Sequence, residues 1–86
     1  MQRIVIYSKQ GCPFCSLLKL ELGKRGFSFE EIDLSDDANR QEFYDRAGVN
    51  TVPQLYLADP DHTVDNLTGR RIGGWSDIKD RWELLE

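Results

Sequence analysis

Apolar residues form a short unbroken run near the start of the chain and then change to a helical spacing. Residues Arg3–Ser8 are predicted to form a buried strand, because their apolar and aromatic side chains follow one another without a polar break. Over residues 14–25 the apolar stripe runs through Cys15, Leu18 and Leu22, which share one face of a helix. The pattern therefore predicts a strand followed by an amphipathic helix.

The next two segments repeat this order. Gly26 ends the first helix, and residues Phe27–Asp33 then alternate between apolar and polar side chains, which is typical of a half-buried strand. Ser35 is a suitable cap for a second helix over residues 36–47, which has acidic residues in its first turn and ends at Gly48. The first helix and its two strands predict a right-handed βαβ unit.

The last third of the chain predicts two strands and a terminal helix. Gln54–Leu57 and Arg70–Ile72 are the strands, and we expect them to pair in antiparallel fashion. The terminal helix is expected to open near Ser76 and Asp77. Its apolar face consists of Trp75, Ile78, Trp82 and Leu85.

The connection from Ala58 to Gly69 has no single interpretation. Asp59-Pro60-Asp61 favours a turn, whereas Thr63-Val64 has the character of a strand, so both an extended hairpin and a mobile loop fit the sequence. The complete order is βαβαββα. It predicts an α/β fold in which helices flank a small four-stranded mixed sheet, and the absence of repeats and linkers predicts a single domain over residues 1–86.

Composition and charge narrow the functional classes. With 86 residues and 40% hydrophobic side chains, the chain can build one hydrophobic core. The sequence has no apolar stretch of 18 residues and no signal-peptide pattern, which predicts a cytoplasmic protein without a membrane partner. A net charge of -4 argues against nonspecific binding to nucleic acid.

The only two cysteines lie at the predicted junction between the first strand and the first helix. Cys12 and Cys15 enclose Pro13 and Phe14, and proline suits the first helical position because it lacks an N–H group. Unpaired amides at the helix start favour an anion on Cys12, and Lys9 adds a nearby cation. Because the thiolate is the nucleophile in disulfide exchange, the sequence predicts a reactive dithiol with Cys15 the more shielded thiol.

Two other roles for the cysteine pair are less consistent with the sequence. Structural zinc needs about four ligands, and besides the cysteines the chain offers only His62, so no metal site is expected. A purely structural disulfide between Cys12 and Cys15 would close a very short loop and would constrain little of the unfolded chain.

Three motifs, in this order along the chain, resemble the dithiol, or class I, glutaredoxin family. They are Tyr7-Ser8-Lys9 leading into Cys12-Pro13-Phe14-Cys15, then Thr51-Val52-Pro53, then Gly73-Gly74 followed by Trp75-Ser76-Asp77. The resemblance covers nearly the whole chain and implies a thioredoxin-like fold. It also implies a glutathione-dependent thiol–disulfide oxidoreductase, in which Cys12 attacks, Cys15 resolves, and glutathione is a co-substrate rather than a bound cofactor.

The same resemblance implies a groove for glutathione. The proline matching Pro53 is cis in similar proteins, which leaves the backbone of Val52 free to pair with the cysteine of glutathione. Gly74 precedes a helix start that suits the γ-glutamyl carboxylate, with Ser76 and Asp77 as side-chain contacts. The implied glutathione contacts are Lys9, Phe14, Arg40, Thr51, Val52, Pro53, Gly74, Ser76 and Asp77.

Some positions depart from the family pattern or have a second interpretation. Phe14 stands where tyrosine is more usual, and Trp75 stands where many members carry a cysteine. Lys9 and Arg40 are implied to hold the glycine carboxylate of glutathione, although a solvated charge on the second helix is an equally simple interpretation of Arg40.

Two other functions stay open at this point. One is a redoxin of similar fold that thioredoxin reductase reduces, in which the glutathione groove would be absent. The other is an iron–sulfur carrier, which fits less well because Cys15 excludes the monothiol pattern and family members with proline at the position of Pro13 seldom hold clusters. The implied partners are glutathione and disulfide-containing or glutathionylated proteins, with ribonucleotide reductase a frequent family client, and a monomer is expected.

Overall fold

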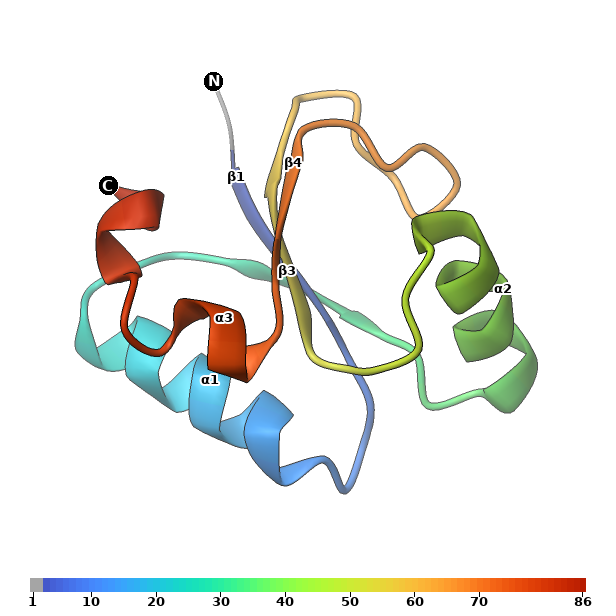
Figure 1. The fold of residues 1–86 in the computed structure, drawn as a ribbon, viewed down its shortest axis with the longest axis horizontal. Coiled ribbons are helices and arrows are strands. Elements are labelled where there is room, and N and C mark those ends of the chain that lie inside the picture. Colours follow the sequence, from blue (N-terminus) through green and yellow to red (C-terminus); the bar gives the residue numbers. More distant parts are fainter. Residues whose placement is uncertain (1–2) are drawn as a thin grey trace.

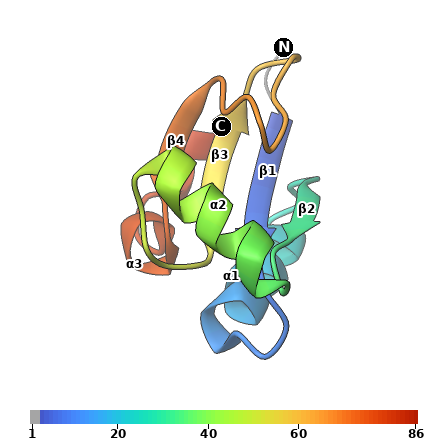
Figure 2. The same ribbon diagram turned by 90° about the vertical axis from the view of Figure 1, so that its right-hand side faces the viewer.

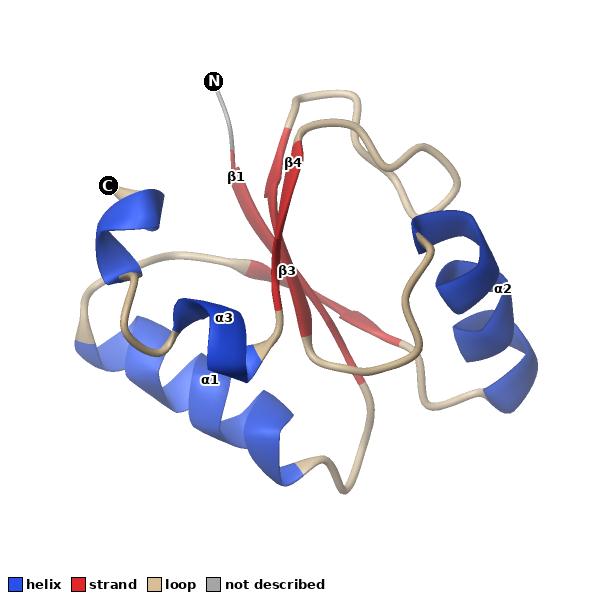
Figure 3. Cartoon of the chain, viewed as in Figure 1, coloured by secondary structure: helices blue, strands red, loops and turns tan. Residues whose placement is uncertain are grey.

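The computed structural model describes residues 3–86, and its elements follow the order predicted from the sequence. The elements are β1 (Arg3–Ser8), α1 (Pro13–Lys24), β2 (Glu30–Asp33), α2 (Asp37–Ala47), β3 (Gln54–Ala58), β4 (Arg70–Gly73), α3 (Trp75–Ile78) and the 3₁₀ helix η1 (Trp82–Leu85). Figures 1 and 3 show α1 and α3 on one side of the sheet and α2 on the other. This arrangement is the predicted α/β layering.

The four strands form one mixed sheet in the order β2-β1-β3-β4. Strand β1 pairs in parallel with β2 and in antiparallel fashion with β3, and β3 and β4 form the expected antiparallel pair. In Figure 2 the helix α2 crosses in front of these strands. Because β1 is central, its C-terminal end at Ser8 carries the chain from the interior directly to the cysteine motif.

Alternation along β1 supplies both halves of the core. Ile4 and Ile6 pack with Leu18 and Leu22 of α1, whereas the next positions face the other way. There Tyr7 stacks on Phe43 of α2 with ring centroids 4.2 Å apart. The helix stripe predicted from the sequence is therefore the buried face of α1.

Two predicted boundaries are wrong. Strand β2 begins only at Glu30, because Phe27 and Phe29 pack against the core without joining the ladder. The cap of α2 is Asp36 rather than Ser35, and its carboxylate accepts a hydrogen bond of 3.0 Å from the amide of Asn39. The hydroxyl of Ser35 is already engaged, since it accepts a hydrogen bond of 2.9 Å from the amide of Gln10.

The terminal helix is also shorter than predicted. Helix α3 ends at Ile78, and η1 follows after a break rather than continuing the same helix. Both pieces still bury the predicted apolar residues, because Ile78 and Trp82 belong to the core cluster around α1. Trp82 meets Trp75 edge to face, with ring centroids 6.1 Å apart.

Apart from Ala58, which ends β3, the connection between β3 and β4 does not lengthen either strand. It contains a small bridge of its own between Thr63 and Asn66. Arg3 donates hydrogen bonds of 2.9 Å to the carbonyl of His62 and to that of Asp59, and Arg46 of α2 donates one of 2.9 Å to the carbonyl of Val64. The connection is thus fastened to β1 and to α2, which the sequence pattern did not indicate.

His62 closes this connection over the core. Its Nδ1 lies 2.7 Å from the carbonyl of Thr68, and its Nε2 lies 2.7 Å from the hydroxyl of Tyr7. Because a carbonyl oxygen only accepts, Nδ1 carries the proton, and in the neutral imidazole the hydroxyl of Tyr7 then donates to Nε2. Burial raises the pKa of Tyr7 well above the usual range of tyrosine.

Replacing Tyr7 with phenylalanine should change the pH dependence of stability. Since the folded pKa of Tyr7 is raised, its contribution to stability is complete below about pH 10 and is lost as the pH rises, because only the unfolded state then releases the proton. The variant should show a shallower alkaline loss of stability. At neutral pH it should be less stable by about 1–3 kcal/mol, because Nε2 of His62 loses its donor.

Urea unfolding between pH 7 and 11 measures both effects. Tyr44→Phe is the matched control, since Tyr44 is only half buried on α2. If the free energy of unfolding falls with rising pH as steeply in Tyr7→Phe as in the parent protein, the raised pKa of Tyr7 is contradicted.

Candidate active site

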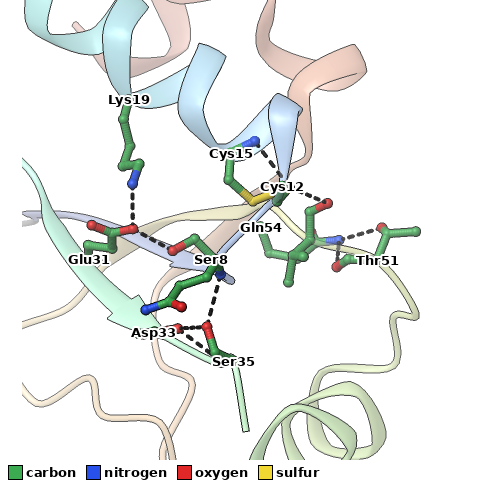
Figure 4. Close-up of a disulfide and its surroundings, with 11 residues drawn as sticks. Ser8, Cys12, Cys15, Lys19, Glu31, Asp33, Ser35, Thr51 and Gln54 are labelled. Atoms are coloured by element: carbon green, nitrogen blue, oxygen red, sulfur yellow. Dashed lines mark hydrogen bonds and ion pairs between the residues drawn. A yellow bond between two sulfur atoms is a disulfide. The ribbon is translucent and has the colours of Figure 1, made fainter. Parts of the chain in front are cut away.

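The dithiol lies where β1 passes into α1. Cys12 caps the helix, Pro13 is the first helical residue, and Cys15 lies on the buried face of the first turn. The two cysteines form a disulfide in this structure, with their Cα atoms 5.2 Å apart (Figure 4). Cys12 is 8% exposed and Cys15 is 1% exposed, which confirms that Cys15 is the more shielded of the two.

Local backbone geometry favours negative charge on Cys12. The amide of Cys15 donates a hydrogen bond of 3.2 Å to the sulfur of Cys12, and Pro13 brings no competing N–H group. The glycine at position 11 has φ +74°, a left-handed conformation that lets the chain turn sharply before the helix. After reduction, the same amide and the helix start stabilise a thiolate on Cys12.

The segment before β3 forms the wall opposite the sulfur of Cys12. The Val52–Pro53 peptide bond is cis, as the resemblance predicts, and the carbonyl oxygen of Val52 lies 3.8 Å from Sγ of Cys12. Gln54, buried at the start of β3, donates from Nε2 to the carbonyl (3.1 Å) and hydroxyl (3.2 Å) of Thr51. Gln54 thereby fixes the backbone that faces the dithiol (Figure 4).

A cavity of about 330 Å³ opens on one side of this wall. It brings together the predicted residues of α1, of the segment before β3 and of the start of α3. Its lining consists of Phe14, Thr51, Val52, Pro53, Gln54, Gly74, Trp75, Ser76 and Asp77. Seven of these nine belong to the glutathione contacts implied by the resemblance, and the sequence analysis missed Gln54 and Trp75 in this role.

A second cavity, of about 360 Å³, opens on the other side of the same wall. It contains Lys9 and Cys12, and it shares Thr51 and Val52 with the first cavity. Tyr44 of α2 also lines it, and the sequence analysis did not include this residue among the candidate contacts. The two cavities therefore meet at Thr51 and Val52, beside the sulfur of Cys12.

The start of α3 is organised by a carboxylate. Oδ2 of Asp77 accepts a hydrogen bond of 3.0 Å from the amide of Gly74. Gly73 has φ +122°, and a Cβ atom there would collide with the carboxyl group of Asp77. The glycine pair thus lets Asp77 fold back over the end of β4, and its exposed carboxylate borders the first cavity.

Arg40 is the predicted contact that neither cavity includes. Its guanidinium donates hydrogen bonds of 3.0 Å to the carbonyl of Leu34 and of 3.3 Å to that of Ser35, and it pairs with Asp37 at 2.6 Å. These bonds tie Arg40 to the start of its own helix, and its side chain is only 19% exposed, so it is not the freely solvated charge of the alternative interpretation either.

A polar network lies beside the dithiol without adding a free cation to it (Figure 4). Glu31 of β2 accepts hydrogen bonds from Lys19 at 2.8 Å and from Ser8 at 2.5 Å. These two hydrogen bonds, that of Lys19 first, hold the pKa of Glu31 below its usual range. Lys19 is thus paired, whereas exposed Lys9 has no ion-pair partner among residues 3–86.

Residues 3–86 contain neither a cluster of metal ligands nor a membrane-spanning helix. No group of three or more potential metal-ligating side chains occurs in that part of the chain. None of the helices described there is long and apolar enough to cross a membrane.

Comparison with known proteins gives consistent matches. The glutaredoxin family model matches residues 4–62. Glutaredoxin 3 of Escherichia coli K12 is 35% identical over 79 residues, which are 91% of this chain and 83% of that protein. The hybrid peroxiredoxin hyPrx5 of Haemophilus influenzae is 37% identical over 78 residues, 91% of this chain but only 28% of that protein. The crystal structure of glutaredoxin 1 from Francisella tularensis superposes with a TM-score of 0.78 at 26% identity, covering 99% of this chain and 96% of that one.

Proposed function

Because this chain belongs to the glutaredoxin family and is a thiol–disulfide oxidoreductase, we propose that glutathione is the reductant of its Cys12–Cys15 dithiol. The observation that carries the proposal is the pair of cavities that meet at Thr51 and Val52 beside the sulfur of Cys12. Glutathione is a tripeptide with its cysteine in the middle and a carboxylate at each end. This shape of glutathione matches the site, in which the sulfur of Cys12 lies between two cavities.

The two cavities differ in the charges they present. Lys9, which has no ion-pair partner within the part of the chain that the structure describes, supplies an ammonium group in one cavity, and this group suits the glycine carboxylate of glutathione. In the other, Ser76 and the carboxylate of Asp77 border the start of α3, where Asp77 suits the α-ammonium group of the γ-glutamyl residue. Between them the backbone of Val52 pairs with the cysteine of glutathione, as a strand edge binds an extended peptide.

The remaining implied contacts differ in their support. Phe14 forms an exposed apolar wall, while Thr51, Pro53 and Gly74 shape the backbone of the same cavity. Arg40 has the least support from the geometry, because its guanidinium already binds carbonyl groups and a carboxylate of its own helix start.

The proposed reaction has two branches. With a glutathionylated protein, the thiolate of Cys12 attacks the glutathione sulfur and the protein thiolate leaves. The thiolate of a second glutathione then attacks the glutathione sulfur that is bound to Cys12. This step regenerates Cys12 and yields glutathione disulfide. With a protein disulfide, Cys12 forms a mixed disulfide, and Cys15 attacks Cys12 to release the reduced protein. This second branch ends in the Cys12–Cys15 disulfide of the structure, which two glutathione molecules reduce.

Two coupled assays test the reductant. The protein is given bis(2-hydroxyethyl) disulfide, and NADPH oxidation is followed either with glutathione and glutathione reductase or with thioredoxin reductase alone. We expect turnover in the first assay and none in the second. Turnover only with thioredoxin reductase would overturn the proposal and establish the redoxin alternative.

We also propose that residues 1–86 act as one domain, as a monomer, in the cytoplasm, on disulfide-containing or glutathionylated proteins. One sheet shared by both core clusters supports the single domain. The dithiol supports the cytoplasmic location, because the reducing conditions of the cytoplasm keep Cys12 and Cys15 in their reactive thiol form.

Charge removal at the two ends of the groove should weaken glutathione binding. Charge-assisted hydrogen bonds contribute about 1.5–3 kcal/mol, and we expect the lower end of this range because Lys9 and Asp77 are both exposed. The apparent KM for glutathione should therefore rise about tenfold in Lys9→Ala and in Asp77→Asn. Asparagine is chosen because its carbonyl oxygen still caps the amide of Gly74. Lys24→Ala, at the far end of α1, is the control.

The same coupled assay with varied glutathione measures this effect. An unchanged KM for glutathione in both variants would show that the groove is misplaced.

A further inference from the structure

The exposed apolar side chains of this protein gather on one helix. Among residues 3–86, the exposed large hydrophobic side chains are Phe14 (56%), Leu17 (37%) and Leu20 (57%), all on α1. The fold does not need them, because the buried face of α1 consists of Cys15, Leu18 and Leu22. We call Phe14, Leu17 and Leu20 the α1 strip.

The α1 strip begins at the reacting sulfur. Phe14 lines the cavity that also contains Val52, and the carbonyl oxygen of Val52 lies 3.8 Å from Sγ of Cys12. In disulfide exchange the sulfur of the client must reach Cys12, so any protein client covers the start of α1 where Phe14 lies. In Figure 1 the start of α1 lies next to the chain segment that leads into β3, and the helix runs away from that segment.

From these observations we propose that the α1 strip is a docking surface for client proteins, and that it binds apolar side chains flanking the reactive cysteine of the client. The inference rests on disulfide exchange at Cys12 and does not require glutathione to be the reductant. The expected substrates are protein disulfides with apolar residues a few positions from the attacked cysteine.

The dimensions of the α1 strip fit a short extended segment. Residues three positions apart on a helix are about 4.5 Å apart along its axis and about 60° apart around it, so Phe14 and Leu20 are separated by about 9 Å along the axis and the α1 strip winds around the helix. An extended chain advances about 3.3 Å per residue, so about three to four client residues that follow this winding cover the α1 strip. A client side chain two to four positions from its cysteine therefore meets Leu17 or Leu20.

The area of the α1 strip favours a transient client over a second copy of this chain. The three side chains together expose roughly 300 Å², which is at the lower end of the largest apolar patches of monomeric proteins. A stable dimer needs about 800 Å² from each partner. An oxidoreductase must release each client after reaction, so a small apolar contact suits its turnover.

The test uses reduced protein without glutathione, so that it is independent of the reductant. Two cyclic disulfide peptides of otherwise identical sequence serve as probes, one with leucine at the second and third positions after the attacked cysteine and one with serine there. Bis(2-hydroxyethyl) disulfide is the probe that cannot reach the α1 strip. Second-order rate constants are measured in single-turnover experiments on the parent protein and on the double variant Leu17→Ser/Leu20→Ser.

The parent protein should reduce the leucine peptide about tenfold faster than the serine peptide. The double serine variant should lose this preference and keep the parent rate with bis(2-hydroxyethyl) disulfide. A second double variant, Leu17→Met/Leu20→Met, keeps an apolar surface and should retain the preference. Urea unfolding checks that all variants fold as stably as the parent.

Two results would overturn the proposal. One is equal rates with both peptides in the parent protein, or a preference that survives in the double serine variant. The other is a concentration-dependent dimer in sedimentation analysis that the double serine variant abolishes, because the α1 strip would then be a contact between two copies. If the coupled assays show no use of glutathione, the peptide experiment still decides this inference by itself.

Discussion

Serine in place of Cys12 should abolish reduction of both protein disulfides and glutathione mixed disulfides, whereas serine in place of Cys15 should abolish only the former. Cys12 borders a cavity and its sulfur receives the amide hydrogen bond, so under the proposed function it is the attacking group in both branches. Cys15 is only 1% exposed, so we expect it to act on the sulfur of Cys12 and not on a substrate directly. Reaction with a glutathione mixed disulfide therefore proceeds without it.

Initial rates with a glutathionylated peptide and with a protein disulfide, both in the presence of glutathione and glutathione reductase, separate the two variants. The activity of Cys12→Ser should fall to the uncatalysed background with both substrates. Equal losses of both activities in Cys15→Ser would reject the assignment of Cys15 as a resolving thiol only.

Truncation of Phe43 to alanine should have the largest effect on stability. Phe43 is fully buried on α2 and stacks on Tyr7 of the central strand, so its loss leaves a cavity between helix and sheet. We expect the free energy of unfolding to fall by about 3–5 kcal/mol. Urea denaturation followed by circular dichroism measures the change.

Leu20→Ala is the matched control for this effect, because Leu20 is an exposed side chain on the surface of a helix. Its free energy of unfolding should change by no more than about 0.5 kcal/mol. A fall of less than about 1 kcal/mol in Phe43→Ala would show that the contact between α2 and the sheet is not a main source of stability.

Local patterns were sufficient for the elements that carry the dithiol. The apolar run of β1 and the stripe of α1 are properties of neighbouring residues, so the sequence places Cys12 and Cys15 at the junction correctly. The cis bond before Pro53 is different, because no local pattern predicts it and only the family resemblance did.

The features that the sequence did not reveal depend on contacts between distant segments. The cap of α2 shifts to Asp36 because Gln10, from the turn after β1, engages Ser35. Gln54 enters the site through its hydrogen bonds to Thr51, and a buried glutamine at the start of a strand was the available signal. Arg3 is distant in sequence but pairs with Ala58 at the end of β3, and from there it fastens the connection between β3 and β4, which sequence periodicity does not report.

Trp75 gives the protein an optical reporter at its own active site. The chain has two tryptophans, Trp75 and Trp82, whose rings meet edge to face. Trp75 lines the first cavity. The guanidinium carbon of Arg25 lies 4.4 Å from the ring centroid of Trp82. All of its tryptophan emission therefore originates on the side of the sheet that carries the dithiol. A ligand entering between Phe14 and Trp75 changes the surroundings of one of these two fluorophores directly, so occupancy of the groove is readable in solution without a label.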